Sequence, residues 1–235
     1  LLLMRKLKGY PAEEPVRLYS GEMAVSMVKI AVPSTLQQSI VQIGILLVQS
    51  VINSFGSTAI AGYSAGMRIE SLSIVPMLAM GNAMSTFTAQ NMGAGKIDRV
   101  KEGYRMCYVI VLTAVLCVMY QLAGGAFVSL FLDSGSSEAY SVGLSYVKFL
   151  SFFYSFIGLK ASTDGLLRGA GDVTAFTVAN LVNLAIRVSV TNLFAPVYGI
   201  QVAWMAVPLG WAANYVISFG WYLTGKWKKV RVIKK

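Results

Sequence analysis

Long stretches without any charged residue most strongly restrict how this chain can fold. Four of them, residues 30–67, 71–95, 106–132 and 188–225, contain no Asp, Glu, Lys or Arg. A helix that crosses a lipid bilayer needs about 20 predominantly apolar residues, and each stretch provides that length. We therefore expect membrane-spanning helices. The charges between these stretches gain importance, because a charge inside a membrane is costly and usually pairs, lines a polar cavity or carries out a function.

The composition agrees with a membrane protein. Hydrophobic residues make up 56% of the 235 positions and charged residues only 13%, against about 25% in an ordinary soluble domain. Much of the net charge of +10 lies beside apolar segments, in an opening arm and a C-terminal tail. This placement is typical of loops on the cytoplasmic side of a membrane. It argues against nucleic acid as a partner.

Turn residues and charges divide the chain into six apolar segments. Helices are expected at about 25–53, 58–91, 98–132, 138–167, 173–194 and 200–224. The predicted fold class is all-α, a polytopic membrane protein with six transmembrane helices. It divides into a cytoplasmic arm at 1–24, a six-helix transmembrane lobe at 25–225 and a basic cytoplasmic tail at 226–235.

Basic residues predict the orientation of the lobe. Besides the arm and the tail, one side holds the basic residues Lys96, Arg99, Lys101, Arg105 and Arg168, whereas the turns of the other side have only Asp133 and Glu138. Because Lys and Arg concentrate in cytoplasmic loops, we expect a multi-pass protein of the cell (inner) membrane, in contact with membrane lipid, with both termini cytoplasmic. The chain begins with Leu1 rather than Met, and its first residues resemble the end of a preceding helix, so an upstream segment is expected.

The first predicted helix has a polar stripe. Its members are spaced by 3, 4, 7 and 4 residues and so share one helix face: Thr35, Gln38, Gln42, Gln49 and Asn53. Side-chain amides in lipid need partners. Two interpretations stay open, an interface that joins helices and the lining of a water-filled cavity.

Polar residues deep in other helices are further candidates. Asn180, Asn183 and Arg187 share one face of the fifth helix, while Arg68 and Glu70 lie within the second. Their depth predicts partners on neighbouring helices, and Glu70 with Arg187 is one candidate pair. A structural ion pair and a functional role are both open.

A third group lies on the fourth helix, where Lys160, Asp164 and Arg168 are spaced at i, i+4 and i+8. Counting back from Arg168 places Asp164 about 6 Å and Lys160 about 12 Å inside the helix. Lys160 can extend its ammonium to the cytoplasmic interface, so local pairing is sufficient to explain this group. We favour a structural role over transport.

Several chemistries lack the residues they require. The chain has no His, which excludes serine triads and His proton relays and makes a metal site improbable with only Cys107 and Cys117. Gly-Ala-Gly occurs at 93–95 and 169–171 without the spacing of a nucleotide loop; glycines there suit a turn with positive φ after a helix. We expect no enzyme, no metal and no cofactor apart from a coupling ion.

Several ordered motifs resemble multidrug and toxic compound extrusion (MATE) transporters. The stretch 90–99, with Gly103, is similar to the family's cytoplasmic signature, and 165–172, followed by Asn180, Asn183 and Arg187, resembles the corresponding later segment. Similar motifs continue at 195–200, 208–211 and 225–228. The resemblance extends from about Met27 to Lys229. Within it, the cytoplasmic motif residues with a structural role are Gln90, Asn91, Gly93, Gly95, Arg99, Arg168, Gly169 and Gly171.

The resemblance implies a two-lobe transporter of which this chain is the second lobe, preceded by the linker between lobes. Its partners would be an N-terminal lobe or a second copy and a small-molecule substrate. The implied activity is Na⁺- or H⁺-coupled antiport that exports cationic or amphipathic compounds by alternating access. The alternatives are a lipid-linked sugar flippase of the same superfamily and a non-transporting membrane assembly module.

The chain departs from the family at two acidic positions. Many members have a carboxylate on the first helix of this lobe, where this chain has Gln38 and Gln42, and some have an acid near the position of Ile157. Ion coupling through this lobe is therefore in question. The expected substrate and coupling cavity comprises Gln38, Gln42, Gln49, Arg68, Glu70, Lys160, Asp164, Asn180, Asn183 and Arg187.

Overall fold

The computed structural model describes residues 21–111, 115–132 and 138–229. Within these ranges the chain forms α-helices and one short 3₁₀ helix, with no strand. The helices are α2 (Gly21–Asn53), α3 (Ser57–Gly93), α4 (Ile97–Val111), α5 (Val115–Ser129), α6 (Glu138–Ser151), α7 (Tyr154–Gly169), α8 (Val173–Tyr198), α9 (Gln201–Thr224) and η1 (Lys226–Lys229). Most of the predicted arm at 1–24 and of the tail at 226–235 lies outside the described residues, and α2 begins within the arm, at Gly21.

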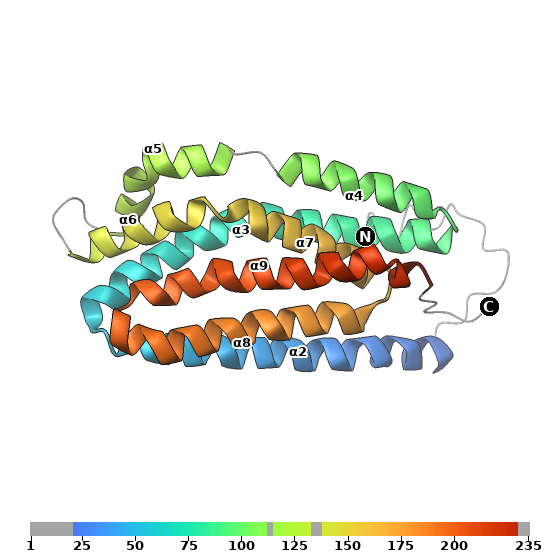
Figure 1. The fold of residues 1–235 in the computed structure, drawn as a ribbon, viewed down its shortest axis with the longest axis horizontal. Coiled ribbons are helices and arrows are strands. Elements are labelled where there is room, and N and C mark those ends of the chain that lie inside the picture. The colour runs from blue at the N-terminus through green and yellow to red at the C-terminus, as the bar shows by residue number, and fades with distance from the viewer. Residues whose placement is uncertain (1–20, 112–114, 133–137, 230–235) are drawn as a thin grey trace, which may run out of the picture.

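The helices run along one long axis, as Figure 1 shows. Two groups are evident from the packing. In one, α8 packs against both α2 and α9; in the other, α3 packs against α4, α6 and α7. The main contact between the groups is that of α7 with α9. The all-α fold class is confirmed.

The described helices lie within or close to the six predicted segments, but two of these segments each contain two helices, and only some of the helices could cross a membrane on their own. Three helices are long and apolar enough to cross a membrane on their own: α3, α8 and α9. A fourth span results if α6 and α7 are taken together, although these two helices meet at an angle of 55°. In α2 the apolar stretch Ser39–Asn53 is found, which is shorter than a full span. The predicted helix at 98–132 comprises α4 and α5, between which residues 112–114 lie outside the described ranges.

The prediction of one continuous helix at 138–167 is wrong. The chain breaks between Ser151 and Tyr154, where neither Gly nor Pro is present. A side chain from another helix stabilises the break: Gln121 of α5 donates a hydrogen bond to the carbonyl oxygen of Lys148 at 2.8 Å and to Ser151 Oγ at 2.9 Å. A broken helix leaves carbonyls without helical partners. Here the Lys148 carbonyl oxygen accepts from the Gln121 amide and, at 2.8 Å, from the Ser151 hydroxyl.

Glycines allow α3 and α7 to approach very closely. A Cβ atom at Gly165 would collide with the backbone of Gly81, and one at Gly169 would collide with the backbone of Ser85. Small residues let helix backbones come together in membranes, where van der Waals packing drives association. The contact brings the buried face of α7 against α3 and fixes the position of Asp164.

The two Gly-Ala-Gly segments form helix ends. Gly95 has φ of 70° and Gly171 has φ of 82°, a backbone conformation that favours glycine. Lys96 N donates to the Asn91 carbonyl oxygen at 2.8 Å, and Asp172 N donates to that of Leu167 at 2.9 Å, the six-to-one bond of a Schellman motif. The predicted turn with positive φ is confirmed in both copies.

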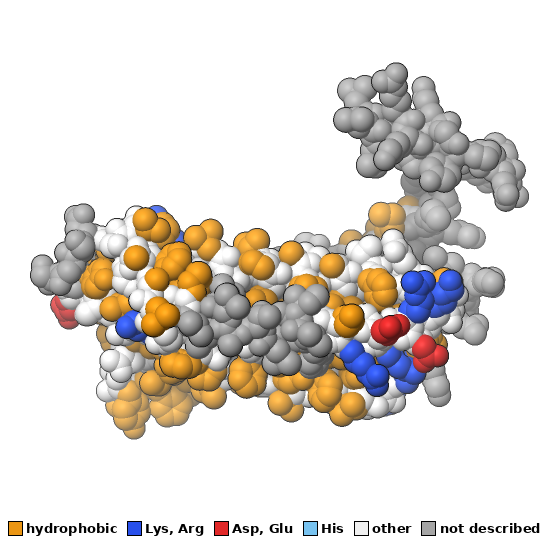
Figure 2. Space-filling model, turned by 90° about the horizontal axis from the view of Figure 1, so that it is seen from above, with side chains coloured by type: hydrophobic (Ala, Val, Ile, Leu, Met, Phe, Trp, Pro, Cys, Tyr) orange, Lys and Arg blue, Asp and Glu red, His pale blue; other side chains and the backbone are white. Residues whose placement is uncertain are grey.

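The surface is apolar along most of its length. Figure 2 shows hydrophobic side chains spread over the visible face and Lys and Arg gathered mainly towards one end. Large exposed side chains include Leu46 at 68%, Leu72 at 63% and Val216 at 67% exposure. Such exposure of large apolar residues is unfavourable in water and normal in lipid, which agrees with a membrane protein.

Candidate functional site

A hydrogen-bonded cluster around Asp164 joins α7, α8 and α9. The Lys160 ammonium forms an ion pair with Asp164 Oδ2 at 2.7 Å and donates to Asn180 Oδ1 at 3.1 Å. Asn180 Nδ2 donates to the same carboxylate oxygen at 3.3 Å. Ser218 Oγ donates to Asp164 Oδ1 at 2.8 Å and lies 3.4 Å from Asn214 Oδ1. We call these five residues the Asp164 cluster.

The local sequence explains why these side chains meet. Lys160 and Asp164 are four residues apart on α7, and Asn214 and Ser218 are four apart on α9, so each pair shares a helix face. Asp164 is only 5% exposed. An isolated charge at that depth would be costly, but one with a cationic partner and several donors is compensated. Arg168 is not part of the cluster; it donates to Asn82 Oδ1 at 2.7 Å.

Two polar atoms beside the Asp164 cluster have no hydrogen-bond partner among the described residues. They are Asn214 Nδ2, on a side chain with 0% exposure, and Asn183 Oδ1. Asn183 lies against Gly210, one helical turn before Asn214 on α9. Asn183 Oδ1 therefore lies between α8 and α9. Buried polar groups are nearly always hydrogen-bonded in native proteins, so this pair marks a place where a further polar group can bind.

Glu70 belongs to a second buried group. Tyr146 of α6 donates a hydrogen bond to Glu70 Oε2 of α3. The Tyr146 ring packs edge-on against Tyr63 at 5.2 Å and against Trp204 at 5.7 Å between ring centroids. Glu70 is 8% exposed. The phenol that bonds to this carboxyl group is thus itself packed among aromatic rings.

The predicted ion pair between Glu70 and Arg187 is not present within 4.0 Å in the described residues. Glu70 uses the Tyr146 hydroxyl instead, since a phenol buried at contact distance provides a donor without the cost of a second charge. Arg187 lies on α8, and its Cγ packs against Gly210 of α9.

Part of the polar stripe of α2 faces away from the rest of the lobe, at Thr35, Gln42 and Asn53. Gly44 packs on Leu184 of α8, and Val48 is buried at 5% exposure. Gln42 lies two residues from Gly44, roughly opposite on the helix, and is exposed. Gln49 is half-buried and donates to Asn53 Oδ1 at 3.0 Å. The Gln38 side chain lies outside the described part of the chain.

The remaining predicted residues lie apart from both clusters. Arg68 is exposed and stacks over the Phe131 ring at 5.9 Å. At the cytoplasmic motif, Gln90, Gly93 and Arg99 are exposed, whereas Asn91 is buried and its Nδ2 donates to the Phe87 carbonyl oxygen at 2.8 Å.

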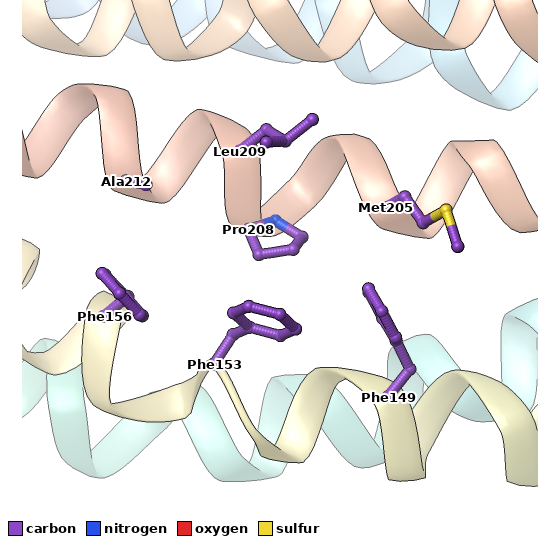
Figure 3. A pocket seen from close by; sticks show the side chains of 7 residues that line it. All are labelled: Phe149, Phe153, Phe156, Met205, Pro208, Leu209 and Ala212. Carbon is purple, nitrogen blue, oxygen red and sulfur yellow. The ribbon is translucent and has the colours of Figure 1, made fainter.

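An apolar pocket lies beside the break between α6 and α7. Its volume is about 260 Å³, and Figure 3 shows three phenylalanines from the α6–α7 segment facing α9 across it. The lining residues are Phe149, Phe153, Phe156, Met205, Pro208, Leu209 and Ala212. All are apolar, so the pocket suits a hydrocarbon or aromatic group and provides no charge to select an ion.

The described side chains do not assemble a metal centre. No group of three or more His, Cys, Asp or Glu side chains comes together in these ranges. Cys107 is a buried free thiol, and the Cys117 side chain is outside the description. Sequence reasoning missed two partners of the acids, Tyr146 and Ser218, and also Asn214, which lies beside Ser218. The spacing of Asn214 and Ser218 by four residues in an apolar helix was the available signal for two of them.

The helices and interior charge clusters define an α-helical, multi-pass membrane lobe. The family model MatE matches residues 33–193. The chain therefore belongs to the MATE family of transporters.

Curated relatives are about twice as long as this chain. The probable multidrug resistance protein YpnP of Bacillus subtilis (strain 168) is 28% identical over 99% of this chain and 52% of its own length. The probable multidrug resistance protein NorM of Thermotoga maritima is 20% identical over 89% of this chain and 46% of its own. The chain thus spans about half the length of the curated relatives it matches.

The fold also matches solved structures. A MATE transporter crystallised in complex with MaD5 superposes with a TM-score of 0.78 at 20% identity, covering 95% of this chain and 51% of that one. An outward-facing multidrug resistance MATE transporter gives a TM-score of 0.77 at 16% identity, over 86% of this chain and 45% of that one. The described helices therefore have the architecture of one MATE lobe.

Proposed function

We propose that this lobe forms half of an antiporter that exports cationic or amphipathic small molecules by alternating access, driven by entry of Na⁺ or H⁺. The other half is an N-terminal lobe or a second copy of this chain. The membrane is the cell (inner) membrane, with both termini cytoplasmic. The names of the relatives, which describe multidrug resistance proteins, and the half-length match support this proposal.

The outward-facing polar stripe of α2 is the single observation that carries the proposal. Gln42 and Asn53 are exposed on the side of α2 that faces away from its contact with α8, and none of the described residues covers Gln42. Amide side chains facing lipid would lack hydrogen-bond partners. A second lobe enclosing a water-filled path would supply them, as in transporters whose substrate site lies between repeats.

The interior acids provide the residues for ion coupling. Asp164 and Glu70 are buried in separate clusters, and Asn180, on the polar face of α8, bonds to the Asp164 cluster. A proton or cation that alters the charge of one acid changes its bonds to neighbouring helices. Coupling then follows because two lobe conformations would satisfy those bonds to different extents.

The proposal is tested by efflux of ethidium from drug-sensitive cells. This lobe is co-expressed with the first lobe of a two-lobe relative, and dye efflux is followed with and without ionophores that dissipate the H⁺ or Na⁺ gradient. Gln42→Ala is compared with Ser50→Ala, a substitution at another exposed position of α2, about 80° round the helix from Gln42. We expect Gln42→Ala to slow efflux severalfold and Ser50→Ala to leave it unchanged.

Each competing hypothesis predicts a different outcome. Equal efflux in both variants refutes the role given to the polar stripe. A folded pair of lobes without gradient-dependent efflux refutes antiport and favours an assembly module. Movement of a lipid-linked sugar without movement of dye favours the flippase.

A further inference from the structure

The Lys160 ammonium occupies a set of acceptors that fits any primary amine. A protonated primary amine has three N–H donors and no acceptor. In the Asp164 cluster two of these donors are used, by Asp164 Oδ2 at 2.7 Å and Asn180 Oδ1 at 3.1 Å. Lys160 is the only cation bonded to this carboxylate in the described residues. Lys160 thus acts as the chain's own ligand for these two acceptor oxygens.

Lys160 is also the most easily displaced partner of Asp164. Its side chain is 16% exposed, against 7% for the Asp164 side chain. Ser218 is completely buried on α9. The ammonium, in contrast, is a compact charge on a flexible four-carbon stem, which can swing out while Ser218 and Asn180 stay in place. The site is therefore reached from the side on which Lys160 lies.

A second observation shows that the cluster has spare capacity for binding. Asn214 has 0% exposure, and its Nδ2 has no hydrogen-bond partner in the described part of the chain, although its Oδ1 lies 3.4 Å from Ser218 Oγ. Asn183 Oδ1, on the adjacent face of α8, is likewise buried and unpaired. Buried polar atoms are nearly always hydrogen-bonded. An ammonium has only donors, so Asn183 Oδ1 is the one of these two atoms that can accept a hydrogen bond from a guest amine.

We propose that the Asp164 cluster is a binding site for a protonated primary amine, which Lys160 occupies at rest and which a guest amine enters by displacing it. This inference rests on the proposed function in one respect: the guest amine is taken to be a transported substrate. Whenever no guest is bound, Lys160 keeps the Asp164 carboxylate paired. The cluster has one carboxylate, that of Asp164, so it pairs with one cation at a time, either Lys160 or the guest amine.

Chemical rescue of a lysine-free variant tests the site. The chain with Lys160→Ala is purified in lipid nanodiscs, and its thermal unfolding is measured against propylammonium chloride at constant ionic strength, with 1-propanol as the uncharged control. Ligands that bind the native state raise the melting temperature. We expect a saturable rise with propylammonium in the variant and none with propanol.

Three comparisons make the result specific. Wild-type chain has a tethered competitor and should require at least about tenfold more propylammonium for the same shift. Adding Asp164→Asn to Lys160→Ala should abolish the shift, and Lys148→Ala, outside the cluster, should behave as wild type. Equal shifts in wild type and Lys160→Ala, or a shift that survives Asp164→Asn, would overturn the proposal.

A folding failure of the variant is also informative. If Lys160→Ala does not fold alone, we expect propylammonium present during purification to restore the folded chain, and propanol not to restore it. Absence of rescue under both conditions contradicts the site. None of these measurements uses transport, so the efflux assay can fail while amine binding is observed, and the reverse can also occur.

Discussion

Two glycines in this lobe are expected to respond to alanine with opposite changes in stability. A Cβ atom at Gly165 of α7 would lie 2.9 Å from the carbonyl carbon of Gly81 and 3.1 Å from its Cα. Gly220 lies within α9, where an added Cβ meets no atom within 4 Å. The added methyl group therefore meets backbone atoms at Gly165 and has open space around it at Gly220.

The expected magnitudes follow from two competing effects. Replacing a glycine inside a helix with alanine favours the helix by about 0.5–1 kcal/mol. Extra volume in a well-packed contact costs about 1–3 kcal/mol, and at Gly165 the cost lies at the upper end because backbone atoms of Gly81 cannot rotate away. We expect Gly165→Ala to lose about 1–2 kcal/mol net and Gly220→Ala to gain about 0.5–1 kcal/mol.

Equilibrium unfolding in mixed micelles measures both changes. The purified chain is titrated with sodium dodecyl sulfate, and helix content and tryptophan fluorescence are followed, since the chain contains four Trp. Gly220→Ala serves as the matched control for helix propensity. A Gly165→Ala variant at least as stable as wild type would refute the close-approach argument. A destabilised Gly220→Ala would refute the propensity argument.

Two further predictions concern the acidic residues Asp98, near the start of α4, and Asp172, just before α8. Asp172 accepts hydrogen bonds from Ala175 N at 3.4 Å and from Trp221 Nε1 at 2.7 Å. Asp172→Ala should therefore destabilise the chain by about 1–3 kcal/mol, and by more than Trp221→Phe, which removes only the second bond. Equal losses of stability in the same unfolding assay would exclude a capping role for Asp172. The hydrogen bond from Lys101 and its charge lower the pKa of Asp98, so this pair stabilises the fold above the ordinary pKa of Asp98, and the effect is lost as pH falls through the lowered value. Lys101→Met should raise the Asp98 pKa towards normal in a carboxyl-carbon NMR titration, and an unchanged pKa contradicts the pairing.

Helix ends were predictable because the signals for them are local. The Gly-Ala-Gly segments end α3 and α7 with glycines at positive φ, and the conformational freedom of glycine is visible in sequence. Charge-free stretches likewise predicted helix positions, since lipid demands apolar residues and internally satisfied backbones. Both arguments depend on neighbours within one or two turns.

The broken helix and the partners of the acids depend on distant residues. The break after Ser151 is held by Gln121, 30 positions away, and no Gly or Pro marks it. Glu70 bonds to Tyr146, 76 positions away, because a phenol at contact distance replaces the oppositely charged partner that charge matching suggested. Asp164 bonds to Ser218, 54 positions away. In each case tertiary packing decides which of several polar residues is within reach.

The two acids differ in what their bonds hold together. Glu70 bonds within the group of helices that packs around α3, since Tyr146 lies on α6. Asp164 of α7 instead bonds to Asn180 of α8 and Ser218 of α9, which belong to the other packed group. A shift of α8 and α9 relative to α7 would therefore break bonds at Asp164 and leave the Glu70 bond intact. A change of charge at Asp164 therefore acts directly on the contact between the two groups of helices, whereas a change of charge at Glu70 acts within the group around α3.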